Sequence, residues 1–453
     1  MKTIFLFFVA FMVLQSLSAT NYYVSGTGSD SNDGLSPTSA FANIQTAADL
    51  TNPGDVVNIM NGTYNQAIPW VYSNHSTILV VNRSGEENAY ITYKNYPGHH
   101  PVISGENCRW GCVEILASYI KLEGLEIAGN NQNITYAQAR VYYDYYEANK
   151  PSVDWTYLGE MNVNGLCIGQ GNLTTNTNHV EVRNCIVHDF QGAGIGGGKC
   201  DYITVENNIS YNNSWYGMYA TSGLSFNSAE DIDTNTGYKI IVRGNIVYNN
   251  KCLIPWASHN GLLSDGNGII IDTFDGSAYA GKTLVENNLS YFNGGSGIHS
   301  YNSSNVDIRN NTAYNNGQVV GYPEIFANSS TNCNIVNNIM YARDGGYCND
   351  SYDMTNVVYD YNLYYGPTRV FGTNDATGDP LFVNLSTDPA VADFHLQMTS
   401  PAINTGSSSY GVGTIDLDGN PRVANGVVDK GCYELPAGTP PTVSITSPAN
   451  NAS

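Results

Sequence analysis

Apolar and polar residues alternate in short runs along most of this chain, and one such run recurs. Its fourth residue is usually asparagine, and two close copies place it at Asn288 and Asn311. Other neighbouring copies are farther apart, so longer segments are inserted between them. The pattern predicts a structural repeat with a basic unit of about 23 residues. The copies are LEGLEI (122–127), VRNCIV (182–187), VENNIS (205–210), VRGNIV (242–247), VENNLS (285–290), IRNNTA (308–313) and IVNNIM (335–340).

A unit this short, with apolar residues alternating with polar ones and turns rich in Asn and Gly, is typical of one coil of a parallel β-helix. Such a coil buries its apolar side chains only when neighbouring coils stack on it. We therefore expect an all-β fold, a single-stranded parallel β-helix with inserted loops.

Two positions of the repeat follow from this stacking. If the coils lie about 4.8 Å apart in register, second residues of opposite charge meet on the outer wall. The asparagines at the fourth position would form an internal ladder of amide hydrogen bonds. The charged series is Glu123, Arg183, Glu206, Arg243, Glu286 and Arg309, and the asparagines are Asn208, Asn245, Asn288, Asn311 and Asn338.

Composition and charge limit the partners. The 453 residues include only 13% charged ones, and the formal net charge is -21. A field of this sign repels nucleic acid and anionic membranes, so we expect neither as a partner. An acidic polymer would bind only through a bridging cation.

The N-terminal segment predicts export, and the C-terminal segment bears on the domain organisation. Residues 1–19 have one early lysine, an apolar run and a final alanine, the layout of a signal peptide. No later apolar run is long enough to span a membrane, so we expect a secreted or cell-surface monomer without membrane insertion. Residues 20–435 would form the β-helix domain. The Pro-rich stretch at 436–453 would be a linker and the start of a truncated immunoglobulin-like module.

The nine cysteines are an odd number scattered along the chain, unlike a small disulfide scaffold. Cys108 and Cys112 in CRWGC form the one close pair and suggest a local disulfide. For most of the others we expect buried free thiols.

The opening of the expected domain resembles a known group of proteins. YVSGTGSDSNDGLS (23–36), FANIQTAADL (41–50), PGDVV (53–57) and NGTY (61–64) are similar to the first segment of secreted right-handed β-helix proteins, including polysaccharide lyase family nine. SPAINTG (400–406) and the segment 415–434 resemble the closing segment of such proteins. The resemblance implies a right-handed helix of coils, and the helical pattern at 41–50 predicts an N-terminal cap over its open end.

Acidic and aromatic residues concentrate in three long insertions instead of spreading over every coil. The first, at about 130–164, is rich in Tyr and contains Trp155, side chains that suit stacking on sugar rings or packing as a lid. The candidates in the second and third are aromatic residues for substrate binding, carboxylates and a lysine: Trp215, Tyr216, Glu230, Asp231, Asp233, Lys251, Trp256, His259, Asp265, Asp272 and Asp275.

One strand position carries further candidates. Aligning GIIID (268–272) with GIHSY (297–301) places Asp272, His299 and Tyr301 outward on neighbouring coils, flanked by the long loops. The same alternation predicts that Glu324 faces outward on the next coil. A face that combines carboxylate, imidazole and phenol is a candidate site.

Two reactions fit these residues. In calcium-assisted β-elimination, carboxylates such as Glu230, Asp231, Asp233 and Asp275 would hold Ca²⁺ against a uronate. A base such as His299 or Lys251 would then remove the α proton. In glycoside hydrolysis, two carboxylates flank the bond, from among Asp265, Asp272, Glu230 and Glu324. We lean towards elimination, with Asp272, His299, Asp265 and Lys251 as the catalytic candidates and Trp215, Tyr216, Trp256, His259, Tyr301 and Glu324 as substrate contacts.

One departure from the family weakens that preference. The resemblance implies a catalytic lysine in a segment like GNG, an apolar residue and Lys, yet residues 266–271 read GNGIII, with Ile270 at the matching position. The family's mechanism therefore does not transfer residue by residue. A non-catalytic protein that binds glycans or a surface remains a third hypothesis.

Overall fold

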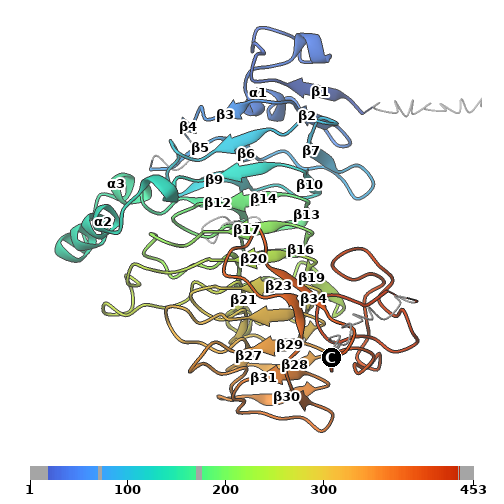
Figure 1. Ribbon diagram of the computed structural model, residues 1–453. Helices are drawn as coiled ribbons and strands as arrows, with labels where there is room; N and C mark the ends of the chain where they lie inside the picture. The colour runs from blue at the N-terminus through green and yellow to red at the C-terminus, as the bar shows by residue number, and fades with distance from the viewer. Residues whose placement is uncertain (1–18, 70–73, 170–175, 437, 439–453) are drawn as a thin grey trace, which may run out of the picture.

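Three long parallel sheets wind along one axis, the architecture of a right-handed β-helix, in the computed structural model (Figure 1). The structure describes residues 19–69, 74–169, 176–436 and 438. The signal-peptide prediction for 1–19 and the linker prediction for 436–453 fall almost entirely outside the described residues. Among the described residues, no helix combines the length and apolarity needed to cross a membrane.

The first and second sheets each contain eleven strands. The first consists of β1 (Asn21–Val24), β2 (Val56–Ile59), β7 (Ile91–Asn95), β10 (Ile120–Glu123), β13 (Thr177–Arg183), β16 (Cys200–Glu206), β19 (Tyr238–Arg243), β22 (Lys282–Glu286), β25 (Val306–Arg309), β28 (Thr331–Val336) and β30 (Thr355–Asp360). The second consists of β3 (Thr63–Tyr64), β8 (Val102–Ser104), β11 (Glu126–Ala128), β14 (Ile186–His188), β17 (Ile209–Tyr211), β20 (Ile246–Tyr248), β23 (Leu289–Tyr291), β26 (Thr312–Tyr314), β29 (Ile339–Tyr341), β31 (Leu363–Tyr365) and β32 (Ala376–Thr377).

The third sheet contains eight strands and bears the candidate site. It runs β6 (Leu79–Val81), β9 (Gly111–Ile115), β12 (Asn164–Ile168), β15 (Ile195–Gly198), β18 (Leu224–Asn227), β21 (Ile269–Asp272), β24 (Ile298–Tyr301) and β27 (Ile325–Asn328). Two short antiparallel pairs, β4 (Ile68–Pro69) with β5 (Ser76–Thr77) and β33 (Phe382–Asn384) with β34 (Asp393–Leu396), complete the strands.

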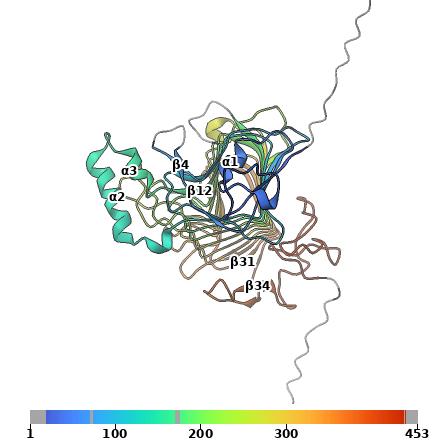
Figure 2. The ribbon, with the colours of Figure 1, turned by 90° about the horizontal axis from the view of Figure 1, so that it is seen from above.

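The helices are few and peripheral. The predicted cap is present as α1 (Ile44–Ala48), whose buried Ile44 and Ala47 pack into the apolar core at the N-terminal end of the stack. The first insertion forms α2 (Tyr136–Asn149) and α3 (Trp155–Gly159), which project from the side of the coils (Figure 2). Three short 3₁₀ turns are η1 (Pro37–Ser39), η2 (Asn131–Asn133) and η3 (Asp275–Ser277).

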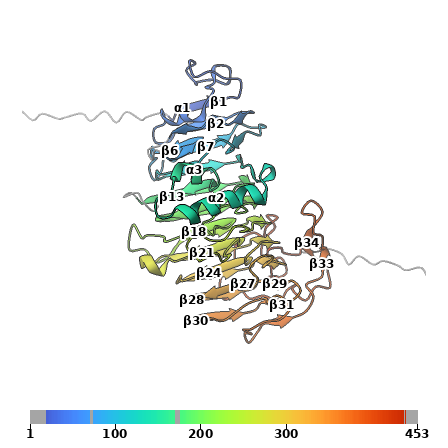
Figure 3. The ribbon, with the colours of Figure 1, turned by 90° about the vertical axis from the view of Figure 1, so that its left-hand side faces the viewer.

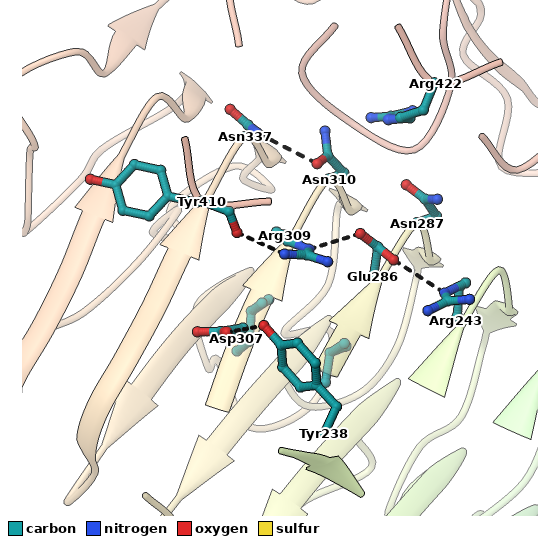
Figure 4. Close-up of polar contacts among 12 residues, drawn as sticks. Tyr238, Arg243, Glu286, Asn287, Asp307, Arg309, Asn310, Asn337, Tyr410 and Arg422 are labelled. Atoms are coloured by element: carbon teal, nitrogen blue, oxygen red, sulfur yellow. Dashed lines mark hydrogen bonds and ion pairs between the residues drawn. The ribbon is translucent and has the colours of Figure 1, made fainter. Parts of the chain in front are cut away.

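The stacking registers confirm the predicted repeat. Strand pairing aligns Glu206 with Arg243, Arg243 with Glu286 and Glu286 with Arg309. Arg309 Nε lies 2.7 Å and Arg243 Nε 3.1 Å from opposite oxygens of the Glu286 carboxylate (Figure 4). Arg183 aligns with Glu123 but pairs with Glu206 and with Glu181 of its own strand. These arginines therefore belong to the outer wall.

The predicted asparagine ladder is also confirmed and buried. Asn245 Nδ2 donates to Asn288 Oδ1 at 3.0 Å, and Asn288 Nδ2 donates to Asn311 Oδ1 at 3.0 Å. The same bond links Asn208 to Asn245 and Asn311 to Asn338. Each amide thus ties its coil to the next one.

A second asparagine ladder, not predicted, stands five residues after the first. It runs from Asn213 through Asn250 and Asn293 to Asn316, with backbone N–H to side-chain oxygen distances of 3.0 Å. Both ladders turn the chain at every coil, which fixes the strand ends to which the loops attach.

The chain closes by folding back on the stack. Its C-terminal segment packs Phe382, Phe394 and Leu396 against Tyr291 and Tyr314 of the second sheet. In Figure 4 the carbonyl oxygen of Tyr410 also accepts a hydrogen bond from Arg309 Nη1, at 2.7 Å. The second sheet is therefore covered on this side, whereas the third sheet keeps its long loops free for a site.

All nine cysteines, Cys108 and Cys112 among them, are free thiols, so the suggested CRWGC disulfide is absent from the described structure.

Candidate functional site

A pocket of about 520 Å³ opens on the outer face of β21, β24 and β27. In Figure 3 these strands lie below α2 and α3. The loops before β21 and β27 form its walls, because coil-to-coil pairing holds the strands flat while the inserted segments rise beside them. Six residues predicted from the sequence line it: Trp256, His259, Asp265, Asp272, His299 and Tyr301.

Two carboxyl groups face this pocket from one coil. Asp272 ends β21, and its Oδ1 accepts a hydrogen bond from Thr273 Oγ1 at 2.6 Å while Oδ2 accepts one from Asn227 Nδ2 at 3.2 Å. Asp265 stands in the turn before the strand and accepts one from Asn267 Nδ2 at 3.0 Å. Asp272 therefore has more hydrogen bonds to stabilise a negative charge than Asp265 has.

Burial and mutual repulsion separate the two groups chemically. Burial, aided by the nearby Asp272 carboxylate, raises the pKa of Asp265 to about 7. Burial also raises the pKa of Asp272, but its hydrogen bonds from Thr273 and Asn227 act in the opposite direction. Because the rise is large at Asp265 and is opposed by two hydrogen bonds at Asp272, Asp265 keeps its proton to a higher pH than Asp272 does.

His299 forms part of the pocket wall. Its register partner is Ile270, so it lies one coil beyond Asp272 and diagonal to it. The ring stacks on Phe326 with centroids 4.0 Å apart and is only 5% exposed. Burial lowers the pKa of His299 to about 3, so it is neutral. Both ring nitrogens are buried and find no hydrogen-bond partner among the described residues, so what the ring presents to the pocket is its edge of carbon atoms.

Aromatic rings surround the carboxyl groups. Trp256 and His259 stack 5.1 Å apart on the third insertion, and Tyr301 is exposed at the end of β24. Tyr322 and Tyr352 complete the wall from loops that the sequence did not single out. No repeat position corresponds to either tyrosine, so periodicity carries no signal for them. Flat rings beside polar tips suit sugar binding.

The prediction that Glu324 contacts substrate is wrong. Glu324 lies just before β27, where strand alternation no longer applies, and it is 1% exposed. Its carboxylate accepts hydrogen bonds from the backbone N and Nδ2 of Asn316, at 2.9 and 2.6 Å. It takes the place of the next asparagine in the second ladder, and burial raises its pKa to about 8.

The proposed calcium ligands are engaged otherwise. Lys239 Nζ, whose side chain is fully buried, lies 2.8 to 2.9 Å from carboxylate oxygens of Asp201, Asp231 and Asp233. Glu230 pairs with Lys199 at 3.6 Å, and Asp275 accepts a hydrogen bond from Ser304.

The side-chain ammonium group of Lys239 thus lies among the carboxylate oxygens that a calcium ion would need as ligands. Over the described ranges, no group of three or more His, Cys, Asp or Glu is placed to hold a metal ion. These four acidic residues therefore do not fit the calcium site predicted from the sequence.

Three other candidates lie away from the pocket. Lys251 packs against Gly294, and burial lowers its pKa. Trp215 donates its indole N–H to the carbonyl oxygen of Asn249 at 2.9 Å, and Tyr216 is buried beneath α2 and α3. The structure therefore gives these residues packing roles and does not place them at the carboxyl pair.

Comparisons with known proteins agree with this fold. The profile described as "Pel9A-like, right handed beta helix region" matches residues 22–334. The crystal structure of pectate lyase Pel9A superposes with a TM-score of 0.51 at 17% identity, covering 92% of this chain and 97% of that chain. No curated protein matches by sequence.

Two further structures are more distant. A GH136 lacto-N-biosidase from Eubacterium ramulus has a TM-score of 0.44 at 14% identity and covers 77% of this chain and 57% of its own. A rhamnogalacturonan lyase has a TM-score of 0.42 at 14% identity and covers 81% and 91%. Since the family match spans more than half of the chain and the fold agrees, this protein belongs to the Pel9A-like family of right-handed β-helix proteins.

Proposed function

We propose that this protein is an exported enzyme that hydrolyses glycosidic bonds in an extracellular polysaccharide, with Asp265 and Asp272 as the reacting pair. The observation that carries the proposal is their placement in one aromatic pocket, where burial raises the pKa of Asp265 to about 7 and hydrogen bonds from Thr273 and Asn227 oppose the rise in the pKa of Asp272. Two carboxyl groups in different protonation states are what glycoside hydrolysis requires.

In this mechanism Asp265 donates its proton to the leaving glycosidic oxygen. Asp272 either attacks the anomeric carbon, giving a covalent intermediate that water hydrolyses, or removes a proton from the attacking water. The first course retains and the second inverts the configuration of the anomeric carbon. Neutral His299, whose ring nitrogens are buried, would contribute a wall of the pocket and not a hydrogen bond to the sugar.

The charges of the pocket favour a neutral sugar. Asp265, Asp272 and Asp350 line it, while no lysine or arginine does so among the described residues. Asp350 is paired with Arg369 at 3.5 Å, so a uronate carboxylate would meet chiefly the Asp272 carboxylate, with no cation in the pocket lining to offset the repulsion. The former candidate base Lys251 lies outside the pocket, and Ile270 occupies the strand position aligned with His299.

Calcium-assisted β-elimination on a uronate glycan is the second candidate, favoured by membership of the Pel9A-like family. The described carboxylates do not supply its calcium ligands as they stand, so we rank it below hydrolysis.

The two reactions differ in their products. Purified protein would be incubated with neutral glycans and with polygalacturonate, with and without chelator, while reducing ends and absorbance of the unsaturated product are followed. Hydrolysis predicts reducing ends without the chromophore, unaffected by chelator and lost in Asp272→Asn. A chelator-sensitive chromophore from the uronate would reject hydrolysis in favour of elimination. NMR of the first anomer released would then assign retention or inversion.

A further inference from the structure

A second pocket, of about 230 Å³, lies along the same edge of the third sheet. It is built on the coils of β12, β15 and β18, next to the β21, β24 and β27 coils of the carboxyl pocket. Its walls include Trp110 and Tyr219, whose ring centroids are 5.8 Å apart, with Asn162, Asn164 and Thr221 beside them.

Trp110 is held in a strained conformation at this pocket. Its φ is 68°, in the left-handed region that bulky residues rarely adopt. The indole N–H donates to the carbonyl oxygen of Trp155 at 3.1 Å, and the backbone N–H donates to that of Gly159 at the same distance. Many other non-glycine residues of this fold adopt the same conformation at its turns, so at Trp110 it shows only that the surrounding structure fixes the position of the ring.

The polar groups at the pocket are already used by the fold. Asn162 donates to the carbonyl oxygen of Leu158 and accepts from the backbone N–H of Met218. Asn164 donates to the carbonyl oxygen of Trp110 and accepts from the N–H of Ala193. What the pocket offers a ligand is therefore the faces of aromatic rings, which suit the apolar face of a sugar.

The two pockets adjoin each other. Gly266, next to Asp265, donates its backbone N–H to the carbonyl oxygen of Thr221 at 2.9 Å. From β12 to β21 the stack advances by three coils, or about 14 Å at about 4.8 Å per coil. Tyr219 and Thr221 form the near end of the second pocket, on the coil of β18 next to β21. A short chain lying parallel to the stacking axis can therefore fill both pockets from end to end, which a single sugar cannot.

The outward strand positions beside the second pocket carry small side chains. The register aligns Cys167 with Gly196 and Gly196 with Ser225. A Cβ on Gly196 would come no closer than 3.4 Å to another atom, so packing does not demand glycine there. Because Gly196 has no side chain, nothing projects from this part of the sheet surface into the path of a bound glycan chain.

We propose that Trp110 and Tyr219 form a distal sugar-binding subsite, and that the substrate is a glycan chain long enough to reach from it to Asp265 and Asp272. This inference rests on the proposed hydrolysis for the position of the cleaved bond. It adds a requirement on chain length: the preferred substrate spans both pockets, which a disaccharide does not.

The test combines cleavage and binding across chain length. Neutral xylo- and gluco-oligosaccharides and oligogalacturonides, from disaccharide to octasaccharide, would be given to the wild type, Trp110→Gly and Tyr219→Ala. Glycine suits the left-handed conformation, so Trp110→Gly relieves backbone strain while it removes the ring. Tyr136→Ala is the control, because its ring is exposed on α2 and lines neither pocket.

We expect kcat/KM of the wild type to rise with chain length until the chain spans both pockets. Trp110→Gly and Tyr219→Ala should each lose about tenfold in kcat/KM on the long chains, the effect of one stacked ring. The loss should become smaller as the chain shortens, and Tyr136→Ala should match the wild type at every length. Equal losses at every length, or none, would overturn the subsite.

Binding separates this inference from the proposed function. Affinity for the same oligosaccharides would be measured calorimetrically with Asp272→Asn, alone and combined with Trp110→Gly. Affinity that grows with length and depends on Trp110 supports the subsite even if the wild type cleaves none of the glycans, a result that refutes hydrolysis alone. Absence of binding to every oligosaccharide refutes both.

Discussion

Replacing Asp265 by asparagine should stabilise the protein at alkaline pH while abolishing its activity. The pKa of Asp265 is raised from 3.8 to about 7, mainly by burial. The unfolded chain therefore ionises this carboxyl at a lower pH than the folded protein does, and it binds fewer protons between these two values. Under that condition the free energy of unfolding falls as pH rises from about 4 to about 7.

The size of the effect follows from the two pKa values. One pKa unit corresponds to about 1.4 kcal/mol, so ionised Asp265 costs the folded state about 4 kcal/mol above pH 7. The asparagine side chain of the variant would carry no such charge, and its oxygen could still accept the hydrogen bond from Asn267. The difference in stability between variant and wild type should thus grow by about 4 kcal/mol from acid to alkaline pH.

Urea unfolding of both proteins, followed by circular dichroism at pH 4 and pH 8, measures this difference. Asp275→Asn is a suitable control, because Asp275 is exposed and lies outside the carboxyl pocket. If Asp265→Asn shifts stability equally at both pH values, Asp265 is not a buried acid with a raised pKa. The assignment of the proton donor would then fail as well.

Three further outcomes are expected. The kcat/KM of the wild type should fall above about pH 7, as Asp265 loses its proton, and a plateau extending to pH 9 would contradict its role as acid. Asn288→Ala should lower the free energy of unfolding, measured in urea, by about 4 kcal/mol, because four hydrogen bonds of about 1 kcal/mol each are lost. A loss below about 1 kcal/mol would show that the ladder does not stabilise the stack. Lys239→Met should destabilise by about 3–5 kcal/mol, since Asp201 would be buried without its counter-ion. In the same variant the pKa of Asp233, about 2 in the wild type, should rise when titrated by NMR.

The sequence predicted the stack because a repeat turns equal sequence positions into equal places in space. Glu286 and Arg309 are one repeat apart and pair across neighbouring coils, as their alternating charges indicated. Asp272 and His299 reached one pocket for the same reason. The second asparagine ladder was available from the same repeat, because Asn293 follows Asn288 as Asn316 follows Asn311.

Alternation failed where the strand ends. Glu324 precedes β27 by one residue and turns inward to cap a ladder, which a period of two cannot anticipate. The calcium site predicted from the acidic loop failed for another reason. Asp231 and Asp233 have the residue type of metal ligands, but in the structure both pair with Lys239, which also pairs with Asp201 of the adjacent coil. Such partners depend on loop geometry, about which the repeat says nothing.

The left-handed Trp110 illustrates the same limit. It lies in CRWGC, where the spacing of the two cysteines suggests a disulfide but nothing indicates a left-handed tryptophan at a pocket. Its conformation depends on Trp155 and Gly159, far along the chain in the first insertion.

The first asparagine ladder keeps the coils in register whatever the length of the loops between them. Successive asparagines of this ladder are 23, 37 or 43 residues apart in sequence, yet each step is joined by the same side-chain hydrogen bond of 3.0 Å. Surface segments can thus grow, shrink or be exchanged without displacing the coils beneath them. A scaffold of this kind is suited to acquiring new glycan specificities by recombining its loops, and an engineer could transplant one loop without redesigning the core.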